Sequence, residues 1–414
     1  MDIPARTERL NDLQAASETF HWPSAWQFGI SLLALISLWG MAALLITLGL
    51  VDQFVQPAGP DATPMLLMAT GLGFFGLLII PSVAYSLGRL IDRPFRLPGW
   101  LRLDVLRWGI LLLPFVLLIG NVIATRTDMA WMFLPPFHLL ALGLPILFLL
   151  WLGTRGIPDL SPQRVWGIFG AGLILGPMII LLLEALAAGA LLLLGVVYIA
   201  SQPDLFLELA AVAEQAQNLD QDLGALVEIL RPYLLRPEVT FTTFAFVAGI
   251  VPLIEEAIKP IGVWLLGKRA TPAQGFAAGL LSGAGYALFE NLGLSSQSPD
   301  WAFAVAARAG TSMLHIITAG LVGWALVLAW RNGRYGRLVL TYLLSIAIHG
   351  LWNGLTLLTL TTALDLAEAA YLAPFQTLGA LAPYGLGGLI LLSLVLLLAG
   401  NRANRDEPVQ VIAP

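Results

Sequence analysis

Long apolar runs separated by short polar segments dominate the chain. Each run is bounded by charged residues, Pro or Gly and reaches the about 20 residues that an α-helix needs to cross a bilayer. The pattern predicts an all-α, polytopic membrane bundle of about ten transmembrane helices. We place these spans at residues 26–50, 65–90, 105–124, 131–152, 166–200, 241–267, 274–293, 301–330, 338–360 and 380–400.

Two parts of this pattern leave alternatives open. The run at 166–200 is longer than one span needs, so it is predicted either as one long helix or as two that split near Gly189. The long polar insertion 201–240 is acidic and has Leu and Val at helical spacing. It is predicted to form one or two amphipathic helices outside the membrane, as a cap on the bundle or as a lid over a substrate site.

The chain is thus expected to comprise five segments. They are a cytoplasmic N-terminal segment 1–25, an N-terminal transmembrane region 26–200, the extracytoplasmic insertion 201–240, a transmembrane core 241–360, and a C-terminal part 361–414 with a loop, the last helix and a cytoplasmic tail.

Composition supports a membrane setting. Hydrophobic residues make up 58% of the chain and charged residues 11%, whereas about 25% of residues are charged in soluble domains. There is no cysteine, which excludes disulfides, a thiolate nucleophile and metals held by cysteine. The net charge of -5 offers no basic surface, so nucleic acid is not an expected partner.

The distribution of Lys and Arg predicts the orientation of the bundle, because cytoplasmic flanks collect these residues. With ten spans and a cytoplasmic N-terminus, Lys259 and Arg308 lie within spans. The basic residues that then fall on the outer side are Arg126, Arg231 and Arg236. Since nearly all the others fall inside, both termini are predicted to be cytoplasmic.

The stretch VPLIEEAIKP, which begins at residue 251, places three charges inside an apolar span. A Glu or Lys at the centre of a span costs about 2.5 to 3.5 kcal/mol by insertion scales, so these charges need partners. Lys259 follows Glu255 by four residues and Glu256 by three, so it can pair with either carboxylate on one helix face. A simple buried ion pair would need one glutamate and not two. The prolines at 252 and 260 predict a kinked helix around the charges.

Three consecutive later spans carry further polar side chains. SGAGYALFENLG holds Glu290 and Asn291, RAGTSMLHIITAG holds Arg308 and His315, and SIAIHGLWNG holds His349 and Asn353. Each alone has an ordinary explanation, such as a hydrogen-bonded carboxyl, a satisfied core histidine or a bridge between helices. Together, and among small residues that let helices approach closely, they predict a convergent site near mid-membrane.

The motifs EEAIK, ALFEN, RAGTSMLH and HGLWN therefore occur in this order on four consecutive spans. They resemble the motif series of the PrsW family of intramembrane proteases, which are distantly similar to the CAAX prenyl proteases and the bacteriocin-processing enzymes. The resemblance covers about residues 241–360, and residues 1–240 carry no assigned motif. It implies hydrolysis of a peptide bond in a membrane-associated protein, such as an anchored anti-sigma factor, in the bacterial cytoplasmic (plasma) membrane.

The resemblance also implies which residues act. The catalytic set it indicates is Glu255, Glu256, Lys259, Glu290, Asn291, His315, His349 and Asn353. Glu255 or Glu256 is the expected general base that activates water. A carboxylate in a low-dielectric site holds a proton more readily than one in water, which suits it to act as a base and then as an acid.

Two roles stay open for the imidazoles. Glu290, His315 and His349 can supply two imidazoles and a carboxylate to a catalytic Zn ion. Alternatively, His349 and Asn353 donate to the oxyanion of the tetrahedral intermediate, and no metal is needed. The HExxH helix of soluble zinc proteases is absent from the sequence, so it does not decide between them.

A second class of function fits the same residue types. Buried Glu and His near mid-membrane also form proton or ion relays in transporters. Such relays usually spread over two repeated halves, whereas the first five spans hold only Glu184 and His138 as isolated candidates. Glu184 is predicted to be a structural, bundle-facing acid. We therefore favour the protease, with a membrane-anchored protein substrate and the lipid bilayer as partners; a scaffold without activity is disfavoured because every motif residue is present.

Overall fold

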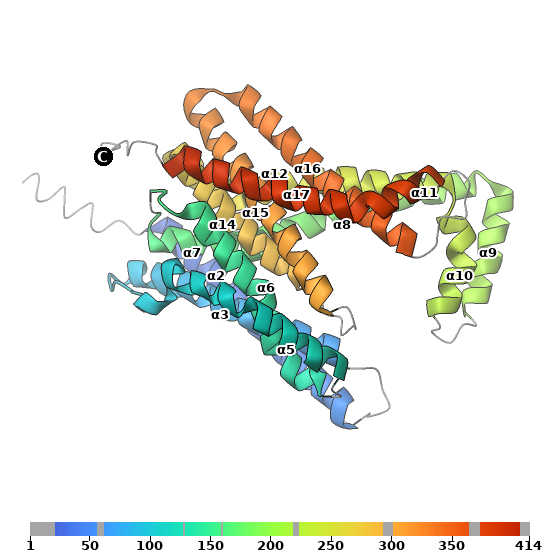
Figure 1. The fold of residues 1–414 in the computed structure, drawn as a ribbon, viewed down its shortest axis with the longest axis horizontal. Helices are drawn as coiled ribbons and strands as arrows, with labels where there is room; N and C mark the ends of the chain where they lie inside the picture. Colours follow the sequence, from blue (N-terminus) through green and yellow to red (C-terminus); the bar gives the residue numbers. More distant parts are fainter. Residues whose placement is uncertain are drawn as a thin grey trace, which may run out of the picture. The chain divides into compact units, whose positions relative to one another are not determined.

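A computed structural model of the chain describes residues 21–55, 62–126, 129–158, 160–217, 223–292, 301–363 and 373–405. Within these ranges the secondary structure is helical and contains no strand, which confirms the all-α prediction (Figure 1). Most of the predicted segment 1–25 and the tail beyond Arg405 lie outside the described residues. The chain separates into two compact units.

The first unit comprises residues 1–144, 160–170 and 292–305. Its helical elements are α2 (Trp22–Val55), α3 (Thr63–Leu90), η1 (Gly99–Leu101), α4 (Leu103–Leu106), η2 (Arg107–Leu112), α5 (Leu113–Arg126), most of α6 (Ala130–Thr154) and α7 (Pro162–Gly170). α2 and α3 pack along each other. The Trp301 indole donates to Nδ1 of His138 at 3.1 Å, so this intramembrane histidine has a structural partner.

The second unit comprises residues 145–159, 171–291 and 306–414. Its helical elements are η3 (Ala171–Leu175), α8 (Gly176–Ala200), α9 (Pro203–Gln217), α10 (Leu223–Leu234), α11 (Pro237–Ala245), η4 (Phe246–Ile250), α12 (Val251–Ile258), α13 (Ile261–Leu266), η5 (Gly267–Arg269), α14 (Pro272–Asn291), most of α15 (Trp301–Asn332), α16 (Tyr335–Ala363) and α17 (Ala373–Arg405). α16 and α17 lie side by side (Figure 1).

Helices α14 and α15 form the interior of the second unit. Every residue from Gly275 to Leu288 is buried. Glycines recur every four residues on the face of α14 that meets α15, and a Cβ at Gly283 would lie only 2.6 Å from the carbonyl oxygen of His315. The missing side chains let the two backbones approach closely. This approach brings His315 next to the residues of α14.

Nine helical runs among the described residues are long and apolar enough to cross a membrane, so the chain is an integral membrane protein. They correspond to nine of the ten predicted spans. The tenth predicted span, 274–293, also forms a helix, α14, but its many small and polar residues make it less apolar than the other nine. Because protein encloses α14, its polar side chains face other helices and not lipid. The cytoplasmic placement of both termini stays a prediction.

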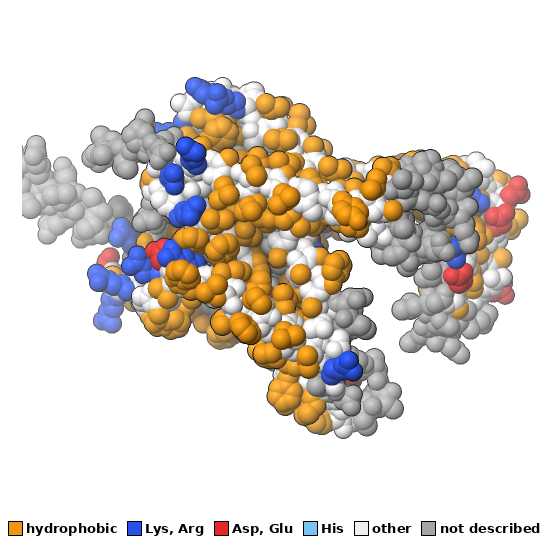
Figure 2. Space-filling model, viewed as in Figure 1, with side chains coloured by type: hydrophobic (Ala, Val, Ile, Leu, Met, Phe, Trp, Pro, Cys, Tyr) orange, Lys and Arg blue, Asp and Glu red, His pale blue; other side chains and the backbone are white. Residues whose placement is uncertain are grey.

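The structure decides the number of helices in both of the segments that the sequence left open, whereas the role of the insertion as a cap or a lid stays a prediction. Residues 162–200 form one helical run with a π-helical turn at η3, and it does not split near Gly189. The insertion 201–240 forms the two helices α9 and α10, on which acidic side chains gather, whereas hydrophobic side chains cover the visible face of α17 (Figure 2). Its position outside the membrane stays a prediction.

Candidate functional site

The two glutamates and the lysine stand at a break in a helix. α11 continues through the π-helical turn η4 into α12, which ends at Ile258 just before Lys259, and α13 begins after Pro260. Pro260 has no N–H to extend the hydrogen-bond ladder. The Ser282 hydroxyl on α14 donates to the carbonyl of Lys259 at 2.6 Å and accepts from the N–H of Gly262 at 3.3 Å. The predicted kink at Pro260 is confirmed, and α14 ties its two sides together.

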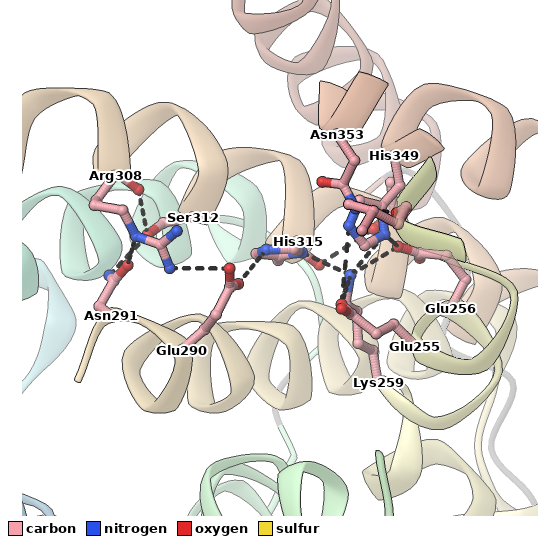
Figure 3. Close-up of polar contacts among 12 residues, drawn as sticks. Glu255, Glu256, Lys259, Glu290, Asn291, Arg308, Ser312, His315, His349 and Asn353 are labelled. Carbon is pink, nitrogen blue, oxygen red and sulfur yellow. Dashed lines mark hydrogen bonds and ion pairs between the residues drawn. The ribbon is translucent and has the colours of Figure 1, made fainter. Parts of the chain in front are cut away.

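The Lys259 ammonium lies at the centre of the site and is completely buried (Figure 3). It has four close neighbours: Oε2 of Glu255 at 2.9 Å, Oε1 of Glu256 at 2.8 Å, Nδ1 of His315 at 2.6 Å and Nδ1 of His349 at 3.3 Å. The carboxylates come from α12 through the expected spacings of three and four residues. The imidazoles come from α15 and α16. Lys259, which the spacing predicted to pair with either glutamate, pairs with both.

His315 uses its two ring nitrogens in opposite directions. Its Nε2 lies 2.5 Å from Oε2 of Glu290, and its Nδ1 faces the Lys259 ammonium. A nitrogen lone pair that faced a carboxylate would repel it, so Nε2 carries the proton. Nδ1 therefore keeps its lone pair and accepts a hydrogen bond from Lys259.

His349 is oriented by Glu256. Its Nδ1 lies 2.9 Å from Oε1 of Glu256, and by the same reasoning it carries the proton and donates. The Nε2 lone pair then points to the side of Glu255, with 3.9 Å between Nε2 and Oε2 of that carboxylate. Glu256 thus sets the tautomer of His349, whereas Glu255 and Nε2 face a common space.

An outer arm extends from His315 through Glu290 to Arg308 (Figure 3). Nη2 of Arg308 lies 3.0 Å from Oε1 of Glu290, and its Nε donates to Oδ1 of Asn291 at 2.7 Å. Asn291 also donates to the Ser312 hydroxyl at 3.1 Å. The Glu290 side chain is 33% exposed, whereas that of His315 is 1% exposed. Glu290 therefore lies at the rim of the site, and the buried Asn291 holds its partner Arg308.

Asn353 stabilises a neighbouring turn of the backbone through a hydrogen bond. Its amide donates to the carbonyl of Val247 at 2.9 Å, within the π-helical turn η4 that precedes the glutamates. A π-helical turn leaves carbonyls without their usual α-helical donors, and such turns occur often at functional sites. Through this bond, α16 positions both His349 and the entry to α12.

One residue at the site, Tyr286, was not singled out from the sequence. The buried Tyr286 ring lies edge-on to that of His315, with 5.2 Å between centroids, and its centroid lies 5.0 Å from Nζ of Lys259. Its position four residues before Glu290, on the same face of α14, is the signal that would have indicated it.

Glu184, which the sequence indicated as an isolated acid, also lies near the site. It lies on α8, which packs against α12 and α14, and it interacts electrostatically with Glu255. Its Oε1 is buried and has no hydrogen-bond partner among the described residues. Glu184 thus faces the bundle as predicted, but this oxygen does not serve as a structural hydrogen-bond acceptor.

Among the described residues, three could together hold a metal ion, namely Glu255, His315 and His349, with one ligand atom of each lying within 4.8 Å of the others. Two imidazoles and a carboxylate are a donor set of catalytic zinc. All three residues are buried, so by type, number and spacing they fit a metal ion. Glu290, expected as a ligand, instead contacts the far nitrogen of His315.

Comparison with known proteins decides between the two classes of function. A sequence model of the PrsW family of intramembrane metalloproteases matches residues 163–378, more than half of the chain. The chain belongs to the PrsW family. Searches of curated proteins and of solved structures find no match.

Membership in the PrsW family makes the chain an intramembrane protease and a peptide hydrolase that acts on a membrane protein substrate. The transporter reading is no longer favoured, although it fits the residue types. The match also begins well before the motifs. It includes most of the run 162–200 and the whole insertion 201–240. Glu184, on α8, therefore lies within the matched region, where the sequence had indicated no motif.

Proposed function

We propose that the chain cleaves a membrane-anchored protein in the bacterial cytoplasmic membrane with a water molecule activated by Glu255. The observation that supports this most directly is the 3.9 Å between Oε2 of Glu255 and Nε2 of His349. This distance is too long for a direct hydrogen bond, and it allows one water to contact both atoms. Both residues are buried, so bulk water does not weaken their interactions.

Each residue at the centre then has a role. Glu255 takes a proton from the water as its oxygen attacks the carbonyl carbon, and the same carboxyl later gives that proton to the nitrogen of the leaving amine. The free lone pair on Nε2 of His349 would orient the water or, with a metal ion bound, hold that ion, and Glu256 holds His349 in the tautomer that leaves this lone pair free. Lys259, or a metal ion in its place, would supply the positive charge that offsets the negative charge developing on the carbonyl oxygen.

The remaining residues of the site do not contact the water themselves but position the residues that do. Glu290 holds His315, and Asn291 and Arg308 hold Glu290. We assign Asn353 to the support of η4, because one N–H of its amide donates to a backbone carbonyl of that turn.

The metal that we propose for the site is Zn²⁺, with Glu255, His315 and His349 as its ligands. When bound, such an ion polarises a carbonyl group and acidifies a bound water. The family's description as metalloproteases and the donor set of the second unit support this assignment. Glu290 is then the partner that orients the ligand His315, as carboxylates commonly orient metal-bound imidazoles.

The test is cleavage by the purified protein in liposomes. Single-pass membrane proteins are incubated with the wild type or with Glu255→Gln, with and without a chelator, and new N-termini are identified by mass spectrometry. We expect cleavage within or beside the membrane segment by the wild type alone. Products that form equally with Glu255→Gln contradict the proposed base, and cleavage that persists in chelator with no bound zinc contradicts the proposed metal.

A further inference from the structure

We propose that the Lys259 ammonium is the resident cation of this site, and that a metal ion binds there only by displacing it. This inference deepens the proposed function and rests on it, because the residues concerned are those of the proposed catalytic centre. It assigns Lys259 a role distinct from that of a simple counter-ion for the glutamates: Lys259 sets how tightly the site holds a metal.

The first argument is the single lone pair of His315. Since Nε2 of His315 faces Glu290, only Nδ1 is available as a metal ligand. That lone pair already accepts from Nζ of Lys259 at 2.6 Å. One nitrogen lone pair serves either a hydrogen bond or a metal bond and not both. A metal ion at this donor therefore requires the ammonium to leave it.

The second argument is that the ammonium is fully satisfied where it lies. An ammonium has three N–H donors. Nζ of Lys259 has three contacts shorter than 3.0 Å, to Glu255, Glu256 and His315. The fourth contact, to Nδ1 of His349 at 3.3 Å, is longer, and that nitrogen donates to Glu256. Donors and acceptors thus match in number around Lys259, as they would around a bound cation.

The third argument is electrostatic. Two atoms that contact Nζ, Oε2 of Glu255 and Nδ1 of His315, belong to residues of the candidate metal group. An ion within ordinary bonding distance of these atoms, about 2.1 Å, would lie less than about 5 Å from the ammonium. Like charges so close repel strongly in a buried site. The carboxylates cannot hold both cations tightly in this arrangement.

The chain offers a matched control, because it has only two lysines, Lys259 and Lys268. Lys268 is exposed on η5, away from the carboxylates. Zn²⁺ affinity is measured on purified protein by competition with a chromophoric chelator. We expect Lys259→Met to bind Zn²⁺ at least about tenfold more tightly than the wild type, because the neutral side chain frees the donors. Lys268→Met should match the wild type, and His315→Gln added to Lys259→Met should remove the gain.

A second measurement uses the unmodified protein and so does not depend on the folding of a variant. Selective isotope labelling of lysine gives two side-chain signals, which Lys268→Met assigns. Addition of Zn²⁺ should change the signal of Lys259 and leave that of Lys268 in place. Stoichiometric Zn²⁺ binding with an unchanged Lys259 signal overturns the proposal.

An affinity in Lys259→Met that is equal to or weaker than that of the wild type also overturns it. Neither measurement needs a substrate or turnover. If the proposal on Lys259 is overturned, the cleavage test of Glu255→Gln still decides the proposed function. If that cleavage test fails, the metal measurements still decide the role of Lys259.

Discussion

Glu255→Gln and Glu256→Gln are neighbouring changes that should have unequal effects. Each removes one negative charge from the surroundings of Lys259, which contacts the two carboxylates at 2.9 and 2.8 Å. Their effects on folding should therefore be similar. They differ in what else they contact. Oε2 of Glu255 faces the space beside Nε2 of His349, whereas Oε1 of Glu256 accepts from Nδ1 of that histidine.

The structure sets the size of the difference. Glutamine at 255 cannot take a proton from water, and loss of a general base lowers turnover by about 100-fold to 10,000-fold. At about 1.4 kcal/mol per factor of ten, this corresponds to about 3 to 5 kcal/mol of the barrier. Glutamine at 256 keeps a carbonyl oxygen that can accept from His349. Loss of its charge should then reduce turnover by about 10-fold to 100-fold, as for other partners that orient a catalytic imidazole.

The assay is the initial rate of cleavage of one single-pass substrate in liposomes, at saturating substrate, for both variants and the wild type. Thermal unfolding of each protein checks that the two changes affect stability equally. Turnover should fall further in Glu255→Gln than in Glu256→Gln. If Glu256→Gln is the more severe change while both proteins unfold at the same temperature, Glu256 and not Glu255 is the base, and the role of the 3.9 Å gap is refuted.

Three further predictions follow from the packing, the rim and the topology. Gly283→Ala should lower the free energy of unfolding by about 1 to 3 kcal/mol, because a Cβ there meets backbone atoms of α15. Gly189→Ala is the control, because the space around Gly189 is open. Unfolding in detergent measures both variants. Glu290→Gln should slow turnover by about 10-fold to 100-fold by releasing His315, while the exposed Glu208→Gln leaves the same cleavage rate unchanged. Reporters fused within α9 should register outside the cytoplasm and those after Arg334 inside it; a cytoplasmic signal from α9 contradicts the ten-span orientation.

The local contacts of the site could be predicted from the sequence, because helical spacing determines them. Lys259 follows the two glutamates by three and four residues, and it pairs with both. The break at Pro260 also follows from local chemistry. The apolar runs predicted the long helices for the same reason, since crossing a bilayer requires length and hydropathy, both of which are local properties.

The direction of each imidazole could not be predicted, because it depends on how separate helices pack. From the sequence, Glu290, His315 and His349 were an acceptable metal set; in the structure Glu290 contacts the nitrogen of His315 that points away from Lys259. Tyr286 was overlooked because an aromatic residue in an apolar span is ordinary until its neighbours are known. α14 is less apolar than the other predicted spans because protein encloses it, so it has little contact with lipid.

The polar character of α14 also has a consequence for biosynthesis. A segment that carries serine, glutamate and asparagine among small residues gains little by entering lipid alone, and the partners of Glu290 and Asn291 are on α15, which leaves the ribosome later. Stable insertion of α14 should therefore wait for α15, and the two should enter the bilayer as a hairpin. A chain truncated between them should leave α14 accessible to a water-soluble labelling reagent, whereas a chain that extends through Asn332 should protect it.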